Sequence, residues 1–147
     1  MPPASLSFLP QDNDPPGSKP SPVQSGTDSR QESSRAKGAS AEDAAVGYLT
    51  DNGYAIVERN YQIRNGEIDC IARDKDGTLV FVEVKSSRTG SCGHPFFWVG
   101  TAKQRKLSYL ARWYLSMKGL IPCPCRFDVI AVVSGKIEHL KNAFLVR

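Results

Sequence analysis

The chain of 147 residues lacks a long apolar run, and its uncharged apolar stretches are short, such as Ile130 to Val133. A membrane-spanning helix needs roughly 18 to 20 apolar residues, so the sequence predicts a soluble protein with no membrane partner. The first thirty residues also lack a basic start followed by an apolar segment, which argues against a secretory signal. We therefore expect a cytoplasmic location.

Cysteine is also sparse, with four residues in the whole chain: Cys70, Cys92, Cys123 and Cys125. Their spacing fits neither the paired CxxC motifs of a zinc site nor a redox CxxC motif. Without an export signal they are expected to be reduced thiols. The close pair Cys123 and Cys125 lacks the second ligand pair that a structural zinc site would need.

Basic residues are nearly absent from the first 34 positions, where 2 Lys and Arg stand against 4 Asp and Glu. From Arg35 onward 17 basic residues face 11 acidic ones, a net charge of +6 that suits a polyanionic partner. Residues 1–34 are rich in Pro, Ser and Gly and offer little to bury, so they are predicted to be a disordered tail. Residues 35–147 are predicted to form one domain.

Hydrophobic periodicity predicts an α/β domain in the order α-β-β-β-α-β-β. The expected helices are Lys37 to Asp51 and a second one, capped by Thr101 and ending near Gly119. The expected strands are Tyr54 to Asn60, Glu67 to Arg73, Thr78 to Lys85, Phe127 to Val133 and Lys136 to Leu140. Tyr109 and Trp113 of the second helix are expected in the core or at its edge.

The connections predict a mixed sheet with helices packed on it. Asn65-Gly66 and Asp76-Gly77 favour tight hairpins, so the first three strands should form an antiparallel meander. The second helix then joins two strands, and a strand-helix-strand crossover makes those strands parallel.

The chemistry-bearing residues lie on two of these strands. Glu83 and Lys85 alternate with Val82 and Val84, so they share one face of an apolar strand, where charge is costly unless it is paired or binds a metal. The short turn at Gly77 should bring Asp69 beside Glu83. Two adjacent carboxylates repel, and a hard cation such as Mg²⁺ relieves the repulsion. An ordinary ion pair at a solvated strand end is the competing interpretation.

The complete pattern resembles the PD-(D/E)xK nuclease superfamily, and within it the YraN-like family of predicted bacterial endonucleases, distantly similar to archaeal Holliday-junction resolvases. The resemblance covers about residues 37 to 140. It rests on Gly38 to Asp43, Tyr54, Arg59 to Tyr61, Gly66 to Asp69, Phe81 to Lys85, Lys103 to Arg105 and Arg126 to Val129.

The resemblance implies a restriction-endonuclease-like fold and a cluster of site residues. Asp69, Glu83 and Val84 would be ligands of Mg²⁺ or Mn²⁺, Lys85 would lie near the attacking water, and Glu42 would reach the site from the first helix. Glu42 could instead be a first-turn acid that favours a helix N-terminus. The family's Glu before a Val-Thr pair is missing here, where the chain has Pro95 to Gly100.

Candidate DNA contacts are Lys103, Arg105 and Lys106 on the second helix and Arg88 after the catalytic strand. Trp98, with Phe96 and Phe97, could stack on an unpaired base or form an apolar lid or dimer contact.

The predicted function is a metal-dependent endonuclease acting on DNA, with branched or flapped DNA as candidate substrates and a homodimer as a candidate assembly. The alternatives are a non-catalytic nucleic-acid-binding module with the same fold and a structural interaction protein.

Overall fold

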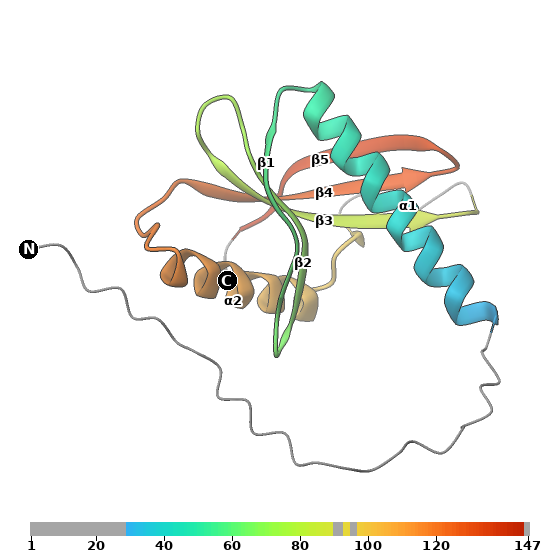
Figure 1. Cartoon of the computed structure of the whole chain (residues 1–147), viewed down its shortest axis with the longest axis horizontal. Coiled ribbons are helices and arrows are strands. Elements are labelled where there is room, and N and C mark those ends of the chain that lie inside the picture. Colours follow the sequence, from blue (N-terminus) through green and yellow to red (C-terminus); the bar gives the residue numbers. More distant parts are fainter. Residues whose placement is uncertain (1–28, 90–92, 95–96, 146–147) are drawn as a thin grey trace, which may run out of the picture.

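The computed structural model describes residues 29–89, 93–94 and 97–145, with side chains from residue 39 onward. Two helices flank one five-stranded sheet (Figure 1). The elements are α1 (Ser29–Asp51), β1 (Ala55–Ile63), β2 (Gly66–Arg73), β3 (Leu79–Ser87), α2 (Thr101–Met117), β4 (Cys125–Val133) and β5 (Lys136–Phe144). This order and the mixed α/β class are those predicted from the sequence.

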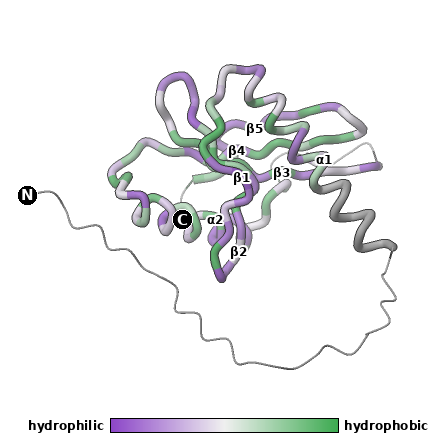
Figure 2. The backbone as a smooth tube through the Cα atoms, in the orientation of Figure 1, coloured by the Kyte–Doolittle hydropathy of each residue, from purple (hydrophilic) through white to green (hydrophobic). Residues whose placement is uncertain are grey.

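The strands lie side by side in chain order, β1-β2-β3-β4-β5. Adjacent strands are antiparallel except β3 and β4, which are parallel because the chain crosses over through α2 between them. Gly77 has a φ of 88° in the β2–β3 turn, a left-handed conformation that favours glycine. Figure 2 shows this turn as hydrophilic and β4 as largely hydrophobic, as expected for a central strand.

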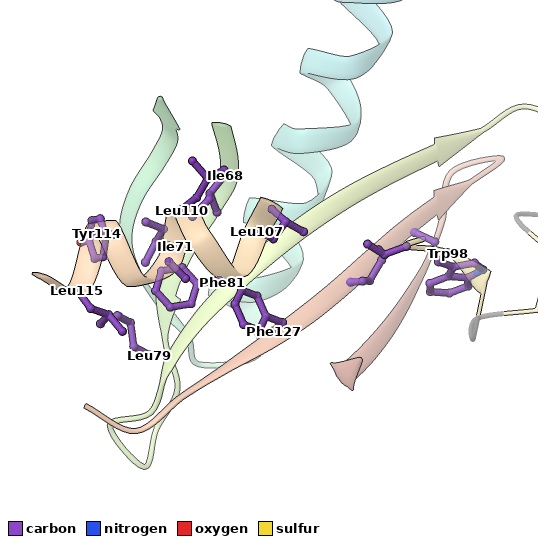
Figure 3. Close-up of a cluster of buried hydrophobic side chains, with 14 of the residues drawn as sticks. Ile68, Ile71, Leu79, Phe81, Trp98, Leu107, Leu110, Tyr114, Leu115 and Phe127 are labelled. Carbon is purple, nitrogen blue, oxygen red and sulfur yellow. The ribbon is translucent and has the colours of Figure 1, made fainter. Parts of the chain in front are cut away.

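Each face of the sheet has its own hydrophobic core. On the α2 side, Phe81 and Phe127 of the two parallel strands pack with Leu110 and Tyr114 of the helix (Figure 3). On the α1 side, Ala45 and Leu49 pack on Val80, Val82 and Ile130. Because strand side chains alternate between faces, this assignment also places Glu83 on the α2 side and Asp128 on the α1 side.

Three details differ from the sequence predictions. Helix α1 begins at Ser29, inside the segment assigned to the tail, while residues 1–28 lie outside the described part. Gly100, in extended conformation and without a side-chain hydrogen bond, occupies the N-cap of α2, so Thr101 is a helical residue and the predicted Thr cap is wrong. Tyr109 and Trp113 are 46% and 45% exposed, so of the two predicted positions, core or core edge, the core is wrong.

No helix in the described part of the chain is long and apolar enough to cross a membrane.

Candidate active site

The carboxylate of Glu83 lies almost fully buried under the N-terminal turn of α2, with 5% of the residue exposed. Its Oε1 atom lies 3.3 Å from Nζ of Lys85 and 3.4 Å from Nζ of Lys103. Its Oε2 atom is buried and has no hydrogen-bond partner among the described residues. A buried carboxylate oxygen without a partner is costly, so this atom is a candidate metal ligand.

Asp69 lies beside Glu83 on the neighbouring strand. The antiparallel register pairs Cys70 with Val82, which places Asp69 next to Glu83 one step further along both strands. Asp69 Oδ2 accepts a hydrogen bond of 2.8 Å from the backbone N–H of Val84. Burial, and then the charge of Glu83, raise the pKa of Asp69 from 3.8 to about 7. The two carboxylates therefore repel each other as predicted from the sequence.

Glu42 approaches this pair from α1. It is half-buried, and its pKa is raised by burial, by the nearby charge of Glu67 and, more weakly, by Asp43 and Glu83, against the opposing effect of Arg59. Because α1 begins at Ser29, Glu42 lies in the middle of the helix and not in its first turn. The interpretation of Glu42 as a helix N-terminal acid is therefore wrong.

The donor set suits a hard divalent cation. In the described part of the chain no three His, Cys, Asp or Glu side chains come close enough together to hold a metal without other donors. Asp69 and Glu83 would bind the ion through their carboxylates. The third candidate ligand, Val84, would bind it through its backbone carbonyl oxygen. The remaining coordination positions of the ion would be left to water. This arrangement fits Mg²⁺ or Mn²⁺, which prefer oxygen ligands, and Mg²⁺ usually keeps several waters. The partnerless oxygen of Glu83 and the raised pKa of Asp69 are the observations that favour a cation here.

A hollow of about 270 Å³ opens beside Lys85 and is lined by Ser86, Ser87, Phe97 and Trp98. It offers space for a substrate group beside Lys85.

The predicted DNA contacts fall into two groups. Lys103 is half-buried and bonded to Glu83, so it belongs to the carboxylate cluster. Arg105, Lys106 and Arg88 are exposed, the first two on α2 and the third after β3. The stem of Lys106 passes over the hairpin turn, where a Cβ added at Gly66 would meet its Cε at 2.5 Å. These three cations remain predicted phosphate contacts.

Trp98 is buried, with 8% exposed, and its indole Nε1 donates a 3.1 Å hydrogen bond to the carbonyl of Gly93. It belongs to the α2-side core (Figure 3), so it is not available to stack on a base or to form a dimer contact. Phe97 is 76% exposed, so its side chain is accessible both for stacking on a base and for a dimer contact. Pro95, Phe96 and Cys92 lie outside the described residues.

A second polar cluster, to which the sequence analysis gave no role, lies on the opposite face of the sheet. Buried Asp128 accepts hydrogen bonds from Arg126 Nε at 3.0 Å, His139 Nε2 at 2.7 Å and the backbone N–H of Asn142 at 2.9 Å. Arg126 also bonds the hydroxyl of Tyr54 at 3.0 Å. Arg126 and Asp128 alternate with apolar residues in a central strand, the same signal that singled out Glu83 and Lys85.

Comparison with known proteins places the chain among uncharacterised relatives. The model of the uncharacterised protein family UPF0102 matches residues 41–132. The UPF0102 protein of Symbiobacterium thermophilum is 47% identical over 116 residues, covering 76% of this chain and 98% of that relative. The UPF0102 protein of Acidovorax sp. (strain JS42) is 43% identical over 113 residues, covering 75% and 85%.

Solved structures show only a weak likeness. A repair endonuclease from Pyrococcus abyssi is 21% identical, with a TM-score of 0.38, over 63% of this chain and 38% of that one. A structure of an EndoMS-dsDNA2 complex is 19% identical, also with a TM-score of 0.38, over 59% of this chain and 34% of that one. The chain therefore spans well under half of either structure. The family match and the identities of 43% and 47% with full-length relatives show that this chain belongs to the UPF0102 family, which confirms its resemblance to the YraN-like family.

Proposed function

We propose that this protein is a metal-dependent endonuclease that hydrolyses phosphodiester bonds in DNA at the cluster of Asp69, Glu83, Lys85 and Glu42. The observation that carries the proposal is the buried, partnerless Oε2 atom of Glu83 next to a second carboxylate whose pKa is raised to about 7. A purely structural ion pair would pair both oxygens of a buried carboxylate, because an unpaired one costs stability.

Asp69, Glu83 and Val84 would hold Mg²⁺ or Mn²⁺ between β2 and β3. Such an ion, when bound, stabilises charge on a phosphoryl oxygen and lowers the pKa of a bound water. The two carboxylates are already held in position without it. Asp69 is fixed by the N–H of Val84, and Glu83 by the ammonium groups of Lys85 and Lys103.

Lys85 would act on the reacting atoms. Its ammonium lies 3.3 Å from Glu83, and the residue also lines the hollow formed with Phe97 and Trp98. From there it can donate hydrogen bonds to the attacking water and to the oxygens of the phosphate as negative charge develops on them. Hydrolysis forms one phosphorus–oxygen bond to that water and breaks the bond to the leaving sugar oxygen. The water loses a proton and the sugar oxygen gains one.

Glu42 would hold a water at the edge of the site. Its pKa is raised by burial first and by neighbouring acids second, and its half-buried position on α1 leaves it able to accept a hydrogen bond. The DNA partner is supported by the net charge of +6 that follows residue 34, and by the exposed cations Arg88, Arg105 and Lys106.

The test is a cleavage assay on a labelled panel of single-stranded, duplex, flap and four-way DNA with Mn²⁺, Mg²⁺ or a chelator. We expect cutting only with a divalent cation, and no cutting by Asp69→Asn or Glu83→Gln. Glu138→Gln, which removes an exposed carboxylate from β5, is the matched control and should cut like the parent. A parent that binds this DNA but cuts none of it with either metal would refute the enzyme and leave a binding module.

A further inference from the structure

The solvent-facing side of α2 carries aromatic rings among basic residues. Tyr109 and Trp113 are 46% and 45% exposed, and Arg105, Lys106 and Arg112 on the same side are exposed as well. The opposite side of the helix is occupied by the core residues Leu107, Leu110, Ala111 and Tyr114. Both rings are therefore available to a partner from solution.

The spacing places these five residues on one face. Residues three and four apart are neighbours on a helix surface, so Arg105 and Lys106 both lie one turn before Tyr109, and Trp113 lies one turn after it. The Cα atoms of Tyr109 and Trp113 are separated by about 6 Å along the helix axis. Arg112 lies three residues after Tyr109 and directly before Trp113.

The charge of the helix indicates what kind of molecule can cover this face. Helix α2 contains Lys103, Arg105, Lys106 and Arg112, and it contains no Asp or Glu. Two copies that met through this face would bring like charges together, which costs free energy. A polyanion is complementary to it.

We propose that this face of α2 binds single-stranded nucleic acid, with bases stacked on Tyr109 and Trp113 and phosphates held by Arg105, Lys106 and Arg112. Stacking on aromatic side chains among cations is the recurrent way in which proteins hold unpaired strands. A duplex cannot use these rings, because its bases are already stacked at about 3.4 Å and present only their edges in the grooves. The two residues start about 6 Å apart along the helix axis, which is wider than the spacing of stacked bases and suits bases that have left such a stack.

The helix that carries this face also borders the proposed active site, and this step rests on the proposed function. Helix α2 begins at that site, where Lys103 lies 3.4 Å from Glu83. Tyr109 follows six residues later, or about 9 Å along the helix axis. A strand bound on the rings would leave the site along α2. The favoured substrate is therefore DNA with an unpaired segment next to the cutting point.

The test measures binding in the presence of a chelator, so that cleavage does not contribute. Fluorescence anisotropy of a labelled oligothymidine and of a blunt duplex of equal length would be compared for the parent and for Tyr109→Ala/Trp113→Ala. We expect the double variant to lose roughly tenfold to a hundredfold in affinity for the single strand and less than threefold for the duplex.

Two control variants separate stacking from general damage. Tyr109→Phe/Trp113→Phe keeps both rings and should restore most of the single-strand affinity. Val57→Ala removes an exposed apolar side chain, 44% exposed, from β1 and not from α2, and should change nothing. Because these side chains are exposed, melting temperatures should stay close to that of the parent.

Equal affinity of the double alanine variant and the parent for the single strand would overturn the inference, as would an equal loss for both oligonucleotides. A parent that dimerises and becomes monomeric in the double variant would show that a second copy covers this face. The two proposals fail separately. A protein that cuts duplex DNA but does not bind the single strand refutes only this inference, and one that binds the single strand without cutting any DNA refutes only the nuclease.

Discussion

Replacing Asp69 with Asn should make the metal-free protein more stable at neutral pH and abolish metal-dependent cleavage. The charge of Asp69 is unfavourable in the folded state because the residue is buried and faces Glu83. Asn has the same shape, and its carbonyl oxygen can still accept the 2.8 Å hydrogen bond from the N–H of Val84. The substitution removes the repulsion and keeps the hydrogen bond that positions this side chain.

The pKa of Asp69 gives the magnitude and the pH range. A rise from 3.8 to about 7 corresponds to about 4 kcal/mol at most. Below about pH 4 the group is protonated in both states. Between about pH 4 and pH 7 the folded state holds a proton that the unfolded state has lost, so the free energy of unfolding of the parent falls as the pH rises. Above about pH 7 the parent has lost this part of its free energy of unfolding completely, whereas the Asn variant keeps it.

The assay is thermal unfolding between pH 4 and pH 8, with and without Mn²⁺. One kcal/mol shifts the melting temperature of a domain of this size by roughly 4 °C, so the variant should melt several degrees above the metal-free parent at pH 8 and show a flatter pH dependence. Saturating Mn²⁺ should raise the melting temperature of the parent and not that of the variant, since a ligand that binds only the folded state stabilises that state. Glu138→Gln should follow the parent throughout.

An Asn variant that melts well below the parent, together with a parent melting temperature that Mn²⁺ leaves unchanged, would refute a cation site at Asp69. That result would identify Asp69 as a member of a structural ion pair, because deleting one partner of a buried pair typically costs about 3 to 5 kcal/mol.

Three further substitutions have distinct expected outcomes. Asp128→Asn should lower the free energy of unfolding by about 1.5 to 3 kcal/mol in chemical denaturation, because it weakens the charged hydrogen bonds of Arg126 and His139 while Arg126 keeps its 2.8 Å ion pair with Asp74, and the Mn²⁺ response of the residual folded protein should persist. Glu42→Gln should slow cleavage at least tenfold with little change in melting temperature, and an unchanged turnover rate would remove it from the site. Trp98→Ala should lower the free energy of unfolding by about 3 to 5 kcal/mol, and Phe97→Ala should lower it by less than about 0.5 kcal/mol. Similar decreases in the melting temperatures of the two variants would contradict the difference in burial.

Most of the architecture could be predicted from local patterns. The Asn-Gly and Asp-Gly turns correctly predicted the two hairpins, and the crossover through α2 correctly predicted the parallel pair of β3 and β4. These signals lie within a few residues of what they determine. Strand ends were less accurate, because β1 extends to Ile63 and β5 to Phe144, where pairing with neighbouring strands and not propensity sets the length.

The burial of aromatic side chains was harder to predict from the sequence than the order of the strands. Tyr109 and Trp113 were expected near the core and are exposed, whereas Trp98 was a candidate base-stacking residue and is buried. An aromatic side chain is apolar enough for a core and common on binding surfaces, so residue type alone does not decide between them. The deciding contact for Trp98 is tertiary, since its loop folds back onto the α2-side core.

The two buried aspartates show what sequence patterns cannot separate. Asp69 and Asp128 each interrupt an apolar strand next to β3, and both would be predicted as costly buried charges. Burial raises the pKa of either one, but hydrogen bonds from His139, Arg126 and the N–H of Asn142 outweigh it at Asp128 and hold its pKa below the ordinary value. At Asp69 one backbone hydrogen bond opposes both burial and the charge of Glu83, and the pKa rises to about 7.

Two of the partners that make this difference lie on a different strand from Asp128. His139 and Asn142 reach Asp128 from β5, and Arg126 is tied to Tyr54 across 72 positions of the chain. A carboxylate with every oxygen bonded adds rigidity and has no remaining capacity for a ligand. A carboxylate pair with a partnerless oxygen and a raised pKa keeps that capacity, at a cost in stability that a bound cation can offset. Partner number, more than burial, is therefore what separates the candidate catalytic acid from the structural one in this fold.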